Sequence, residues 1–203
     1  QAGDDNYIAA TEVQQTLTVE KAAQTITFGA LDNKTFGDAD FDLTATASSG
    51  LDVSYTSSDL TVATIDGSTV TIVGAGTTTI TASQAGDDNY IAATEVQQTL
   101  TVEKAAQTIT FGALDNKTFG DADFDLTATA SSGLDVSYTS SDLTVATIDG
   151  STVTIVGAGT TTITASQAGD DNYIAATEVQ QTLTVEKAAQ TITFGALDNK
   201  TFG

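Results

Sequence analysis

The chain has 203 residues, of which 27 are acidic and 6 are basic, so its net charge at pH 7 is -21. It contains no arginine, and so no surface rich enough in positive charge to neutralise phosphates, which argues against nucleic acid as a partner. Histidine and cysteine are also absent, which excludes disulfides and thiolate metal sites and leaves serine or threonine without a histidine base, so we expect no enzyme activity.

An 83-residue repeat organises the chain. Every residue from Gln84 to Gly203 is identical to the residue 83 positions earlier, so two copies are complete and a third stops inside the repeat. A period of this length predicts a tandem array of identical domains. We expect residues 1–20 to be the last strand of a preceding repeat, 21–103 and 104–186 to be two identical domains, and 187–203 to begin a third. The chain should then be a section of a longer repetitive protein.

Apolar and polar residues alternate along each repeat, with threonine as the usual polar residue, and this period of two predicts strands. The expected strands of one repeat are residues 16–19, 25–28, 41–46, 53–56, 62–65, 69–72 and 77–82. Turn residues separate them, most clearly at Asp66-Gly67, a pair that favours a hairpin. Seven short, half-buried strands in about 80 residues predict an all-β fold, an antiparallel sandwich of two sheets rather than a barrel.

The apolar positions of these strands define the expected core of a repeat. Its members are Leu17, Val19, Ile26, Phe28, Phe41, Leu43, Val53, Tyr55, Ile65, Val70, Ile72 and Ile80, with Tyr90 closing the last loop onto its domain. The joint between repeats, residues 17–26, contains neither glycine nor proline, unlike a flexible linker. We therefore expect a short, stiff joint and domains arranged end to end as a rod, each adding roughly 35 to 45 Å.

Acidic residues spaced two apart form the strongest candidate for a ligand site, because carboxylate oxygens suit calcium. The candidate ligands are Asp38, Asp40, Asp121, Asp123, Asp135, Asp170 and Asp171. The topology expected from the strand order would bring the first pair and the last three residues to facing ends of neighbouring domains. The stretch lacks the glycine and the distal glutamate of a helix-loop-helix calcium loop, so the alternative is a set of solvated carboxylates.

Three weaker hypotheses concern modification and surface binding. Lys21 and Lys34 raise the possibility of a lysine-to-asparagine crosslink, although solvated surface lysines explain them as well. Asn33-Lys34-Thr35 is a glycosylation sequon that recurs at Asn116 and Asn199, or simply a polar turn. Rows of alternating threonines could bind ice or crystalline polysaccharide, although threonine is also an ordinary exposed strand residue in a twisted sheet.

Several phrases of the repeat resemble one family. They are Lys-Ala-Ala-Gln-Thr-Ile-Thr-Phe (21–28), Ala-Thr-Ala-Ser-Ser-Gly-Leu (45–51), Tyr-Thr-Ser-Ser-Asp (55–59), Val-Ala-Thr-Ile (62–65) and Val-Gly-Ala-Gly-Thr-Thr-Thr-Ile-Thr-Ala-Ser (73–83). Together they resemble the bacterial immunoglobulin-like (Big-type) tandem repeats of large cell-surface adhesins. The resemblance implies a seven-stranded immunoglobulin-like sandwich that is exported and serves as a stalk, and it carries no catalytic residues. The cysteine pair and tryptophan of antibody domains are missing here.

These observations favour a structural function, a repetitive mechanical spacer in an extracellular or cell-surface fibre. The expected partners are neighbouring identical repeats of the same chain and other fibres, and no cofactor is expected unless calcium binds. No apolar run approaches the roughly 20 residues that cross a bilayer, so we expect no membrane insertion in this segment. The alternative is a binding module, in which each repeat presents the loop Asp87-Asp88-Asn89-Tyr90 or a threonine face to a carbohydrate or a host protein, with avidity from repetition.

Overall fold

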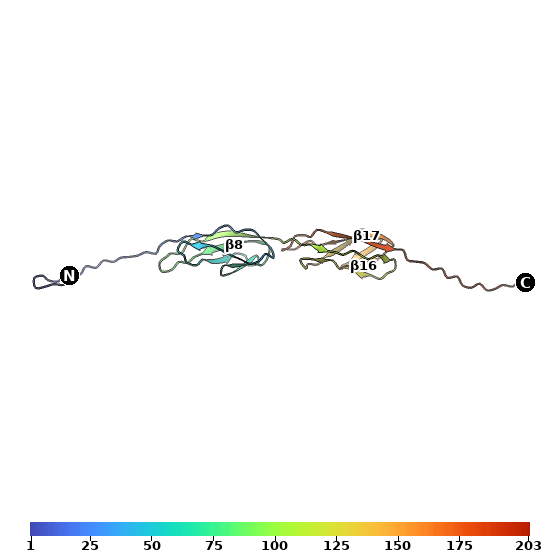
Figure 1. Ribbon diagram of the computed structural model, residues 1–203, viewed down its shortest axis with the longest axis horizontal. Coiled ribbons are helices and arrows are strands. Elements are labelled where there is room, and N and C mark those ends of the chain that lie inside the picture. Colours follow the sequence, from blue (N-terminus) through green and yellow to red (C-terminus); the bar gives the residue numbers. More distant parts are fainter. The chain divides into compact units, whose positions relative to one another are not determined.

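The computed structural model describes residues 1 to 203 and contains 18 strands and no helix (Figure 1). The all-β prediction is therefore confirmed, and the chain contains no helix that could span a membrane. It divides into two compact units. The first unit consists of Gln1–Lys34, Asp38–Val73 and Thr77–Thr101, and the second of Thr35–Gly37, Gly74–Gly76 and Val102–Gly203.

The strands recur with the period of the sequence. The first nine are β1 (Ile26–Thr27), β2 (Lys34–Thr35), β3 (Phe41–Asp42), β4 (Thr46–Ala47), β5 (Ser54–Ser57), β6 (Ala63–Asp66), β7 (Thr69–Ile72), β8 (Gly76–Ser83) and β9 (Val96–Glu103). The next nine are β10 (Ile109–Thr110), β11 (Lys117–Thr118), β12 (Phe124–Asp125), β13 (Thr129–Ala130), β14 (Ser137–Ser140), β15 (Ala146–Asp149), β16 (Thr152–Ile155), β17 (Gly159–Ser166) and β18 (Val179–Glu186).

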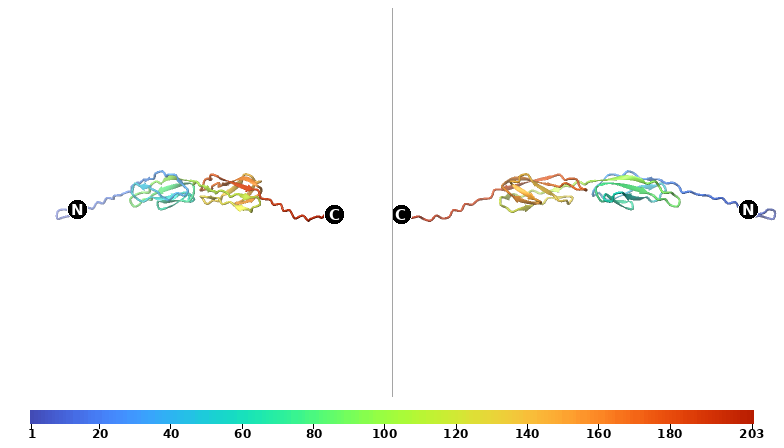
Figure 2. Two further views of the ribbon diagram at one scale, coloured as in Figure 1. Left: turned by 45° about the vertical axis from the view of Figure 1, so that its right-hand side comes forward. Right: turned by 180° about the vertical axis from the view of Figure 1, so that it is seen from behind.

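The strands of each repeat form two layers (Figure 2). One layer is the sheet β2-β9-β8-β5, and the other combines the sheet β3-β7-β6 with the pair β1-β4. Strands β10 to β18 reproduce this as β11-β18-β17-β14, β12-β16-β15 and β10-β13. When β1 and β2 are read as one segment, and β3 and β4 as another, seven segments remain, in the order of an immunoglobulin-like sandwich. The predicted fold class is confirmed.

Two strand pairings bear on the predicted topology, one a hairpin and the other a parallel pair. Strands β15 and β16 form a hairpin in which Asp149 pairs with Thr152, so only Gly150 and Ser151 form the loop. Gly150 has a φ of 60°, and glycine at the first loop position is what a tight hairpin of this kind requires. By contrast β11 runs parallel to β18, whereas the sequence predicted antiparallel pairing alone. The difference arises because the first segment pairs with β13 and then crosses, without reversing, to the other sheet.

The core lies between the layers and follows the alternation of the strands. In the second unit its buried members are Ile109, Phe111, Leu126, Val145, Ala146, Val153, Ile163, Ala165, Leu183 and Val185. The predicted core positions are either among these residues or half-buried against them, and the positions missed are those of Val145, Ala146 and Ala165. Leu17 and Val19 themselves are 85% and 83% exposed, because residues 1–20 pair with no sheet, whereas their copies Leu183 and Val185 are buried.

A half-buried tyrosine of the third segment holds the second segment between β12 and β13. The hydroxyl of Tyr138 accepts a hydrogen bond from the backbone N–H of Ala128 at 2.9 Å. Its ring packs against Phe111 with a centroid distance of 5.8 Å. Tyr55 makes the same contacts with Ala45 and Phe28 83 residues earlier. The aromatic ring therefore fills the core while its polar end satisfies a backbone group that no strand pairs.

Candidate functional site

The loop between β17 and β18 contains a self-supporting turn, Asp170-Asp171-Asn172-Tyr173, called here the DDNY turn. One carboxylate oxygen of Asp170 accepts hydrogen bonds from the backbone N–H groups of Asn172 and Tyr173, both at 2.8 Å. The backbone N–H of Asp170 donates to the carbonyl of Tyr173 at 3.1 Å. An aspartate is suited to this position because its short side chain reaches the N–H groups two and three residues ahead. The turn is thus fixed before any neighbour contacts it.

The strand that enters the second unit holds this turn from one side. The backbone N–H of Ala105 donates to the carbonyl of Asn172 at 2.9 Å, and the N–H of Ile174 donates to the carbonyl of Ala105 at 3.0 Å. The ammonium group of Lys104 donates to the carbonyl of Asp170 at 2.5 Å. This parallel bridge makes the DDNY turn part of the scaffold, because Asp170, Asn172 and the next residue, Ile174, are bonded to the entering chain.

A buried glutamine holds the base of the same loop. Gln107 is 6% exposed, and its amide nitrogen donates to the side-chain oxygen of Gln167 at 2.7 Å and to the carbonyl of Ile174 at 2.8 Å. Its amide oxygen accepts from the hydroxyl of Ser132 at 2.5 Å. Gln24 makes the same three bonds in the first unit. Sequence reasoning missed this residue, although Gln107 precedes Ile109 and Phe111 at the spacing of side chains on one face of a strand.

The outward side chains of the turn have partners of their own in the second unit. The N–H of Ala75 donates to the side-chain oxygen of Asn172 at 2.9 Å. The ring of Phe36 meets the ring of Tyr173 edge to face, with centroids 5.5 Å apart and planes at 85°. This is a favourable aromatic geometry, because the positive edge of one ring faces the negative face of the other. Phe36 and the segment Gly74–Gly76 therefore act as a socket for Asn172 and Tyr173.

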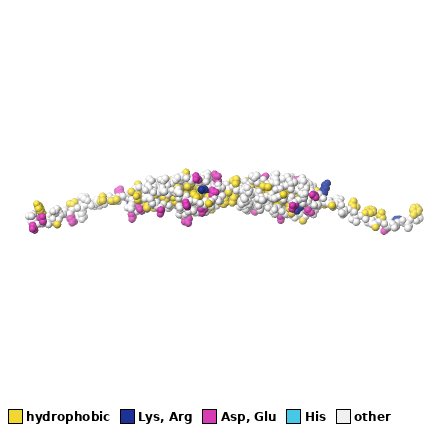
Figure 3. All heavy atoms as spheres, in the orientation of Figure 1, with side chains coloured by type: hydrophobic (Ala, Val, Ile, Leu, Met, Phe, Trp, Pro, Cys, Tyr) yellow, Lys and Arg dark blue, Asp and Glu magenta, His cyan; other side chains and the backbone are white.

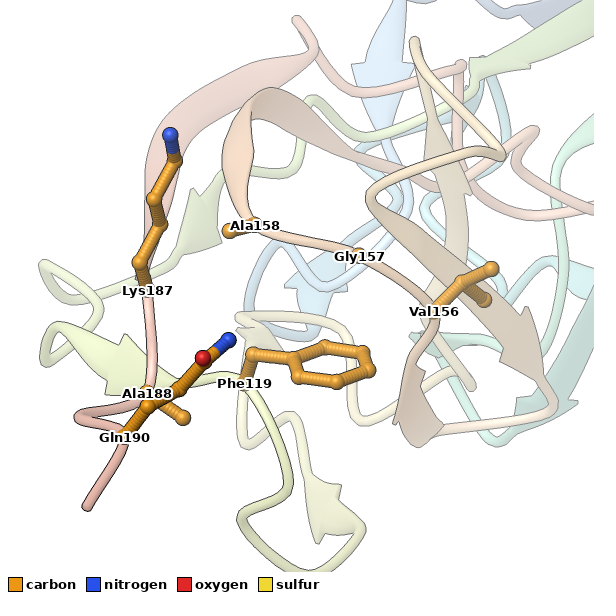
Figure 4. Close-up of a pocket in the computed structure, with 7 residues that line it drawn as sticks. All are labelled: Phe119, Val156, Gly157, Ala158, Lys187, Ala188 and Gln190. Atoms are coloured by element: carbon orange, nitrogen blue, oxygen red, sulfur yellow. The ribbon is translucent and has the colours of Figure 1, made fainter. Parts of the chain in front are cut away.

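The same socket recurs 83 residues later as an open hollow. It has a volume of about 540 Å³ and is lined by Phe119, Val156, Gly157, Ala158, Lys187, Ala188 and Gln190. In Figure 4 the Phe119 ring points toward Val156 across the hollow, whereas Lys187 points away from it. Phe119 is 49% exposed, and Val156 is 46% exposed. The hollow is mainly apolar, with the backbone of Gly157 and Ala158 along one side.

The candidate calcium ligands lie in separate hydrogen-bonded settings. No group of three or more acidic side chains lies close enough together to hold a metal ion. Asp40 accepts a hydrogen bond from the hydroxyl of Thr71 at 2.9 Å, and Asp123 accepts one from Thr154 at 3.0 Å. Asp121 accepts from the backbone N–H of Thr118 at 2.8 Å. Each of these carboxylates therefore has a local structural partner.

The remaining candidate ligands divide in the same way. Asp170 supports the DDNY turn, and the carbonyl of Asp135 accepts a hydrogen bond from the side chain of Gln167 at 3.5 Å. Asp38 is exposed and has an interaction partner, and Asp171 is exposed at the tip of the turn. Calcium binding at these residues stays a prediction.

The other sequence candidates also have defined positions. Lys34 lies over the ring of Phe41, 4.6 Å from its centroid, and Lys21 donates to the carbonyl of Asp87 at 2.6 Å. The sequon residue Asn116 is exposed, and its amide donates to Glu186 at 3.4 Å. Crosslinking and glycosylation stay predictions. The threonine rows have carboxylates beside them. The hydroxyl of Thr152, for example, donates to the carboxylate of Asp125 on the neighbouring strand at 2.7 Å.

One carboxylate in each repeat has a shifted pKa. The hydroxyl of Thr144 and, to a smaller extent, its backbone N–H donate hydrogen bonds that hold the pKa of Asp142 below the usual range of an aspartate. Thr61 lowers the pKa of Asp59 by the same two bonds. Both aspartates are half-buried, and their bonds to exposed threonines order the turn that precedes β6 or β15. The pKa of a buried general acid is raised, whereas the pKa of these aspartates is lowered. We therefore assign them a structural role.

Comparison with known proteins found similar folds among solved structures. No protein-family model and no curated protein matches the sequence. Among solved structures, domains 1–6 of the surface layer protein SbsC align over 92% of this chain and 30% of that one, with 19% identity and a TM-score of 0.36. Drosophila N-cadherin EC1-4 aligns over 83% of this chain and 50% of that one, with 15% identity and a TM-score of 0.35.

A third likeness is to the immunoglobulin domains 1–5 of Sidekick-1, over 84% of this chain and 40% of that one, with 13% identity and a TM-score of 0.32. The chain thus spans half the length of these proteins or less. With identities below 20% and TM-scores below 0.5, the likenesses say nothing about what the chain binds.

Proposed function

We propose that the chain is a section of an extracellular or cell-surface stalk or fibre, in which identical immunoglobulin-like sandwiches act as repeated mechanical spacers. The observation that carries this proposal is the identical 83-residue repeat, because each copy forms the same strands and the same core. A function that depends on number and spacing needs every unit to be the same. A catalytic function would need only one.

The short joint supports a spacer of defined length. Strand β9 ends at Glu103, and Ala105 already forms a β-bridge with Tyr173. Only Lys104 therefore lies between the end of β9 and this bridge. Neither glycine nor proline occurs from Leu100 to Ile109. A joint of this kind has few free dihedral angles, unlike a linker rich in glycine and serine.

The acidic surface supports repeated use of one sequence. Figure 3 shows acidic side chains spread over the visible face of both units, with few lysines among them. Identical neighbouring domains are prone to exchange strands while they fold, because each can pair with the other's segments. Like charge on every copy opposes such association.

Length measurements test the proposal. In small-angle scattering or electron microscopy of chains with two, four and six repeats, a spacer should lengthen linearly, by roughly 35 to 45 Å for each repeat. Growth with the square root of repeat number would contradict the proposal, since a flexibly jointed chain lengthens in that way.

A second candidate function, repeated binding, is favoured by one observation. Asp88 and Asp171 are exposed at the tips of their turns, where a partner could reach them. Substituting both with alanine should leave a spacer unchanged in length and in cell attachment. Loss of attachment with an unchanged length would instead identify the turns as adhesive.

A further inference from the structure

The hollow at Phe119 and the socket at Phe36 are the same surface in two states. Each consists of a phenylalanine that follows a short strand and of a Gly-Ala-Gly segment that begins the long strand β8 or β17. One surface holds Asn172 and Tyr173. The other is open. Because the two sequences are identical, a difference between them comes from their surroundings, and the bound turn is the part of those surroundings that contacts the socket directly.

Burial records this difference at the phenylalanine, the glycine and the alanine, whereas Val73 and Val156 are almost equally exposed, at 44% and 46%. Phe36 and Ala75 are half-buried and Gly74 is buried, whereas Phe119 and Ala158 are exposed and Gly157 is half-buried. The turns show the matching change. Asn172, which accepts the hydrogen bond of Ala75, is half-buried, whereas its copy Asn89 is exposed.

The glycines explain how a backbone can form one wall of the socket. A Cβ atom on Gly157 would lie 2.6 Å from the carbonyl oxygen of Thr144, so only glycine fits there. The N–H of Gly157 bonds to the carbonyl of Val145 at 3.2 Å. The backbone at this glycine therefore packs closely against its own sandwich. The N–H of the next residue, Ala75 or Ala158, can then donate a hydrogen bond to a docked turn.

The partner exists in a form ready to bind. Residues 1–10, which pair with no sheet, make the DDNY turn by themselves: Asp4 accepts hydrogen bonds from the N–H groups of Asn6 at 2.8 Å and Tyr7 at 2.9 Å. The N–H of Asp4 donates to the carbonyl of Tyr7 at 2.8 Å. Tyr7 is 76% exposed. A turn that is ordered before binding loses little conformational entropy on docking.

We propose that the hollow at Phe119, Val156, Gly157 and Ala158 is a docking site for the DDNY turn of a further copy of the repeat. The tyrosine ring of that turn meets Phe119 edge to face, and its asparagine accepts a hydrogen bond from the N–H of Ala158. The entering strand at Ala188 pairs with the same turn, as Ala105 does with Tyr173. This inference goes beyond the spacer function, because it assigns a binding surface and its ligand, and it holds for a binding array as well.

Backbone hydrogen exchange of the present chain gives the first test. We expect the N–H of Ala75 to exchange at least about tenfold more slowly than the N–H of Ala158, because only the first is hydrogen-bonded. Asn172→Ala should remove that protection, whereas the control Asn89→Ala, in the copy with no such partner, should leave it unchanged. Fast exchange of both N–H groups in the unmodified chain would overturn the proposal, because the socket at Ala75 would then hold no turn.

A lengthened chain gives the second test. Appending residues 121–203 after Gly203 continues the period by one full repeat and supplies a further DDNY turn. Ala158 should then become protected to the level of Ala75, and the ring proton signals of Phe119 should move toward the positions that we expect for Phe36, whose ring meets that of Tyr173. Phe119→Ala should abolish the new protection of Ala158 while the core amides of β17 keep theirs.

Two outcomes distinguish a DDNY turn of the next repeat in the same chain from a DDNY turn of a second chain. Protection of Ala158 in the lengthened chain that disappears when the appended copy of Tyr173 is changed to alanine supports docking in series. Protection of Ala158 in the unmodified chain at millimolar concentration, removed by Tyr7→Ala, supports docking of a second chain through residues 1–10. If Ala158 stays unprotected in the lengthened chain while the appended sandwich is folded, the proposal fails.

Discussion

At the scale of single residues, Gln107 is the polar side chain on which the loop before β18 depends. It is buried beside the core residue Ile109, yet each of its three hydrogen bonds reaches a different part of the chain, at Gln167, Ile174 and Ser132. No buried side-chain polar atom in the structure lacks a partner. A buried amide with all its hydrogen bonds made costs the fold little stability. Removing it leaves its partner groups buried without a hydrogen bond.

Replacing this glutamine should therefore destabilise the fold. We expect Gln107→Leu to lower the free energy of unfolding by about 2 to 4 kcal/mol, because the polar groups that Gln107 served lose their partner in the interior. Gln190 is a matched control, since it has the same sequence neighbours but is exposed. Gln190→Leu should change the free energy of unfolding by less than about 0.5 kcal/mol. Urea denaturation measures both, and equal effects would contradict the role of Gln107.

The hydrogen-bonded pair of Asp142 and Thr144 predicts a pH effect. The folded-state pKa of Asp142 is lowered, so the stability from this pair is present above the pKa of the unfolded carboxyl and is lost as pH falls through the folded value. In Thr144→Val the hydroxyl is gone, and we expect the carboxyl to titrate at a higher pH. NMR titration of Asp142 in both proteins measures this shift. An unchanged midpoint would show that the hydroxyl bond does not form in solution.

At the scale of elements, the alternation of the sequence was sufficient to find the sandwich but not its edges. It located the long strands and the hairpin at Asp66-Gly67, because there the local pattern and the tertiary pairing agree. It missed the strand Lys117–Thr118, which consists of two polar residues with no alternation around them. That strand forms because β18 offers it an open edge, and no local signal contains this information.

The hairpin of β15 and β16 depends on a glycine that the sequence did identify through its copy Gly67. Gly150→Ala should lower the free energy of unfolding by about 1 to 2 kcal/mol, since a residue with a Cβ is strained at a φ of 60°. Gly112→Ala is the control, because a Cβ there meets nothing within 4 Å and the backbone is not left-handed. Thermal denaturation compares the two variants. If they melt at the same temperature, the turn geometry does not limit stability.

The candidate site was predicted only in part, for a physical reason. The sequence indicated the loop at Asp87-Asp88-Asn89-Tyr90 as a possible contact, and the structure shows the same turn holding its own hydrogen bonds. It did not indicate Phe36 or Ala75. Phe36 follows a short polar strand, and Ala75 acts through its backbone N–H, so neither has a side-chain pattern that identifies its role.

At the scale of the whole molecule, net charge dominates the response to solvent. With a charge of -21, the folded chain repels itself more than the expanded unfolded chain does. We expect the melting temperature at pH 7 to rise when sodium chloride increases from 10 to 500 mM, because the screening length falls from roughly 30 Å to a few ångströms. Calorimetry measures the change, and a fall in melting temperature would contradict it. Solubility should be lowest near the isoelectric point of about 4.1.

The parallel pairing of β11 and β18 has a consequence for a chain that is pulled by its ends. Lys117 pairs with Val185, Thr118 pairs with Glu186, and the N–H of Phe119 adds a bond of 2.8 Å to the carbonyl of Glu186. Since β11 is near the start of its sandwich and β18 is the last strand, tension pulls these two parallel strands in opposite directions along their own axes. The bonds are then loaded in shear, all at once. An antiparallel pair in the same place would be unzipped one bond at a time, at a lower force.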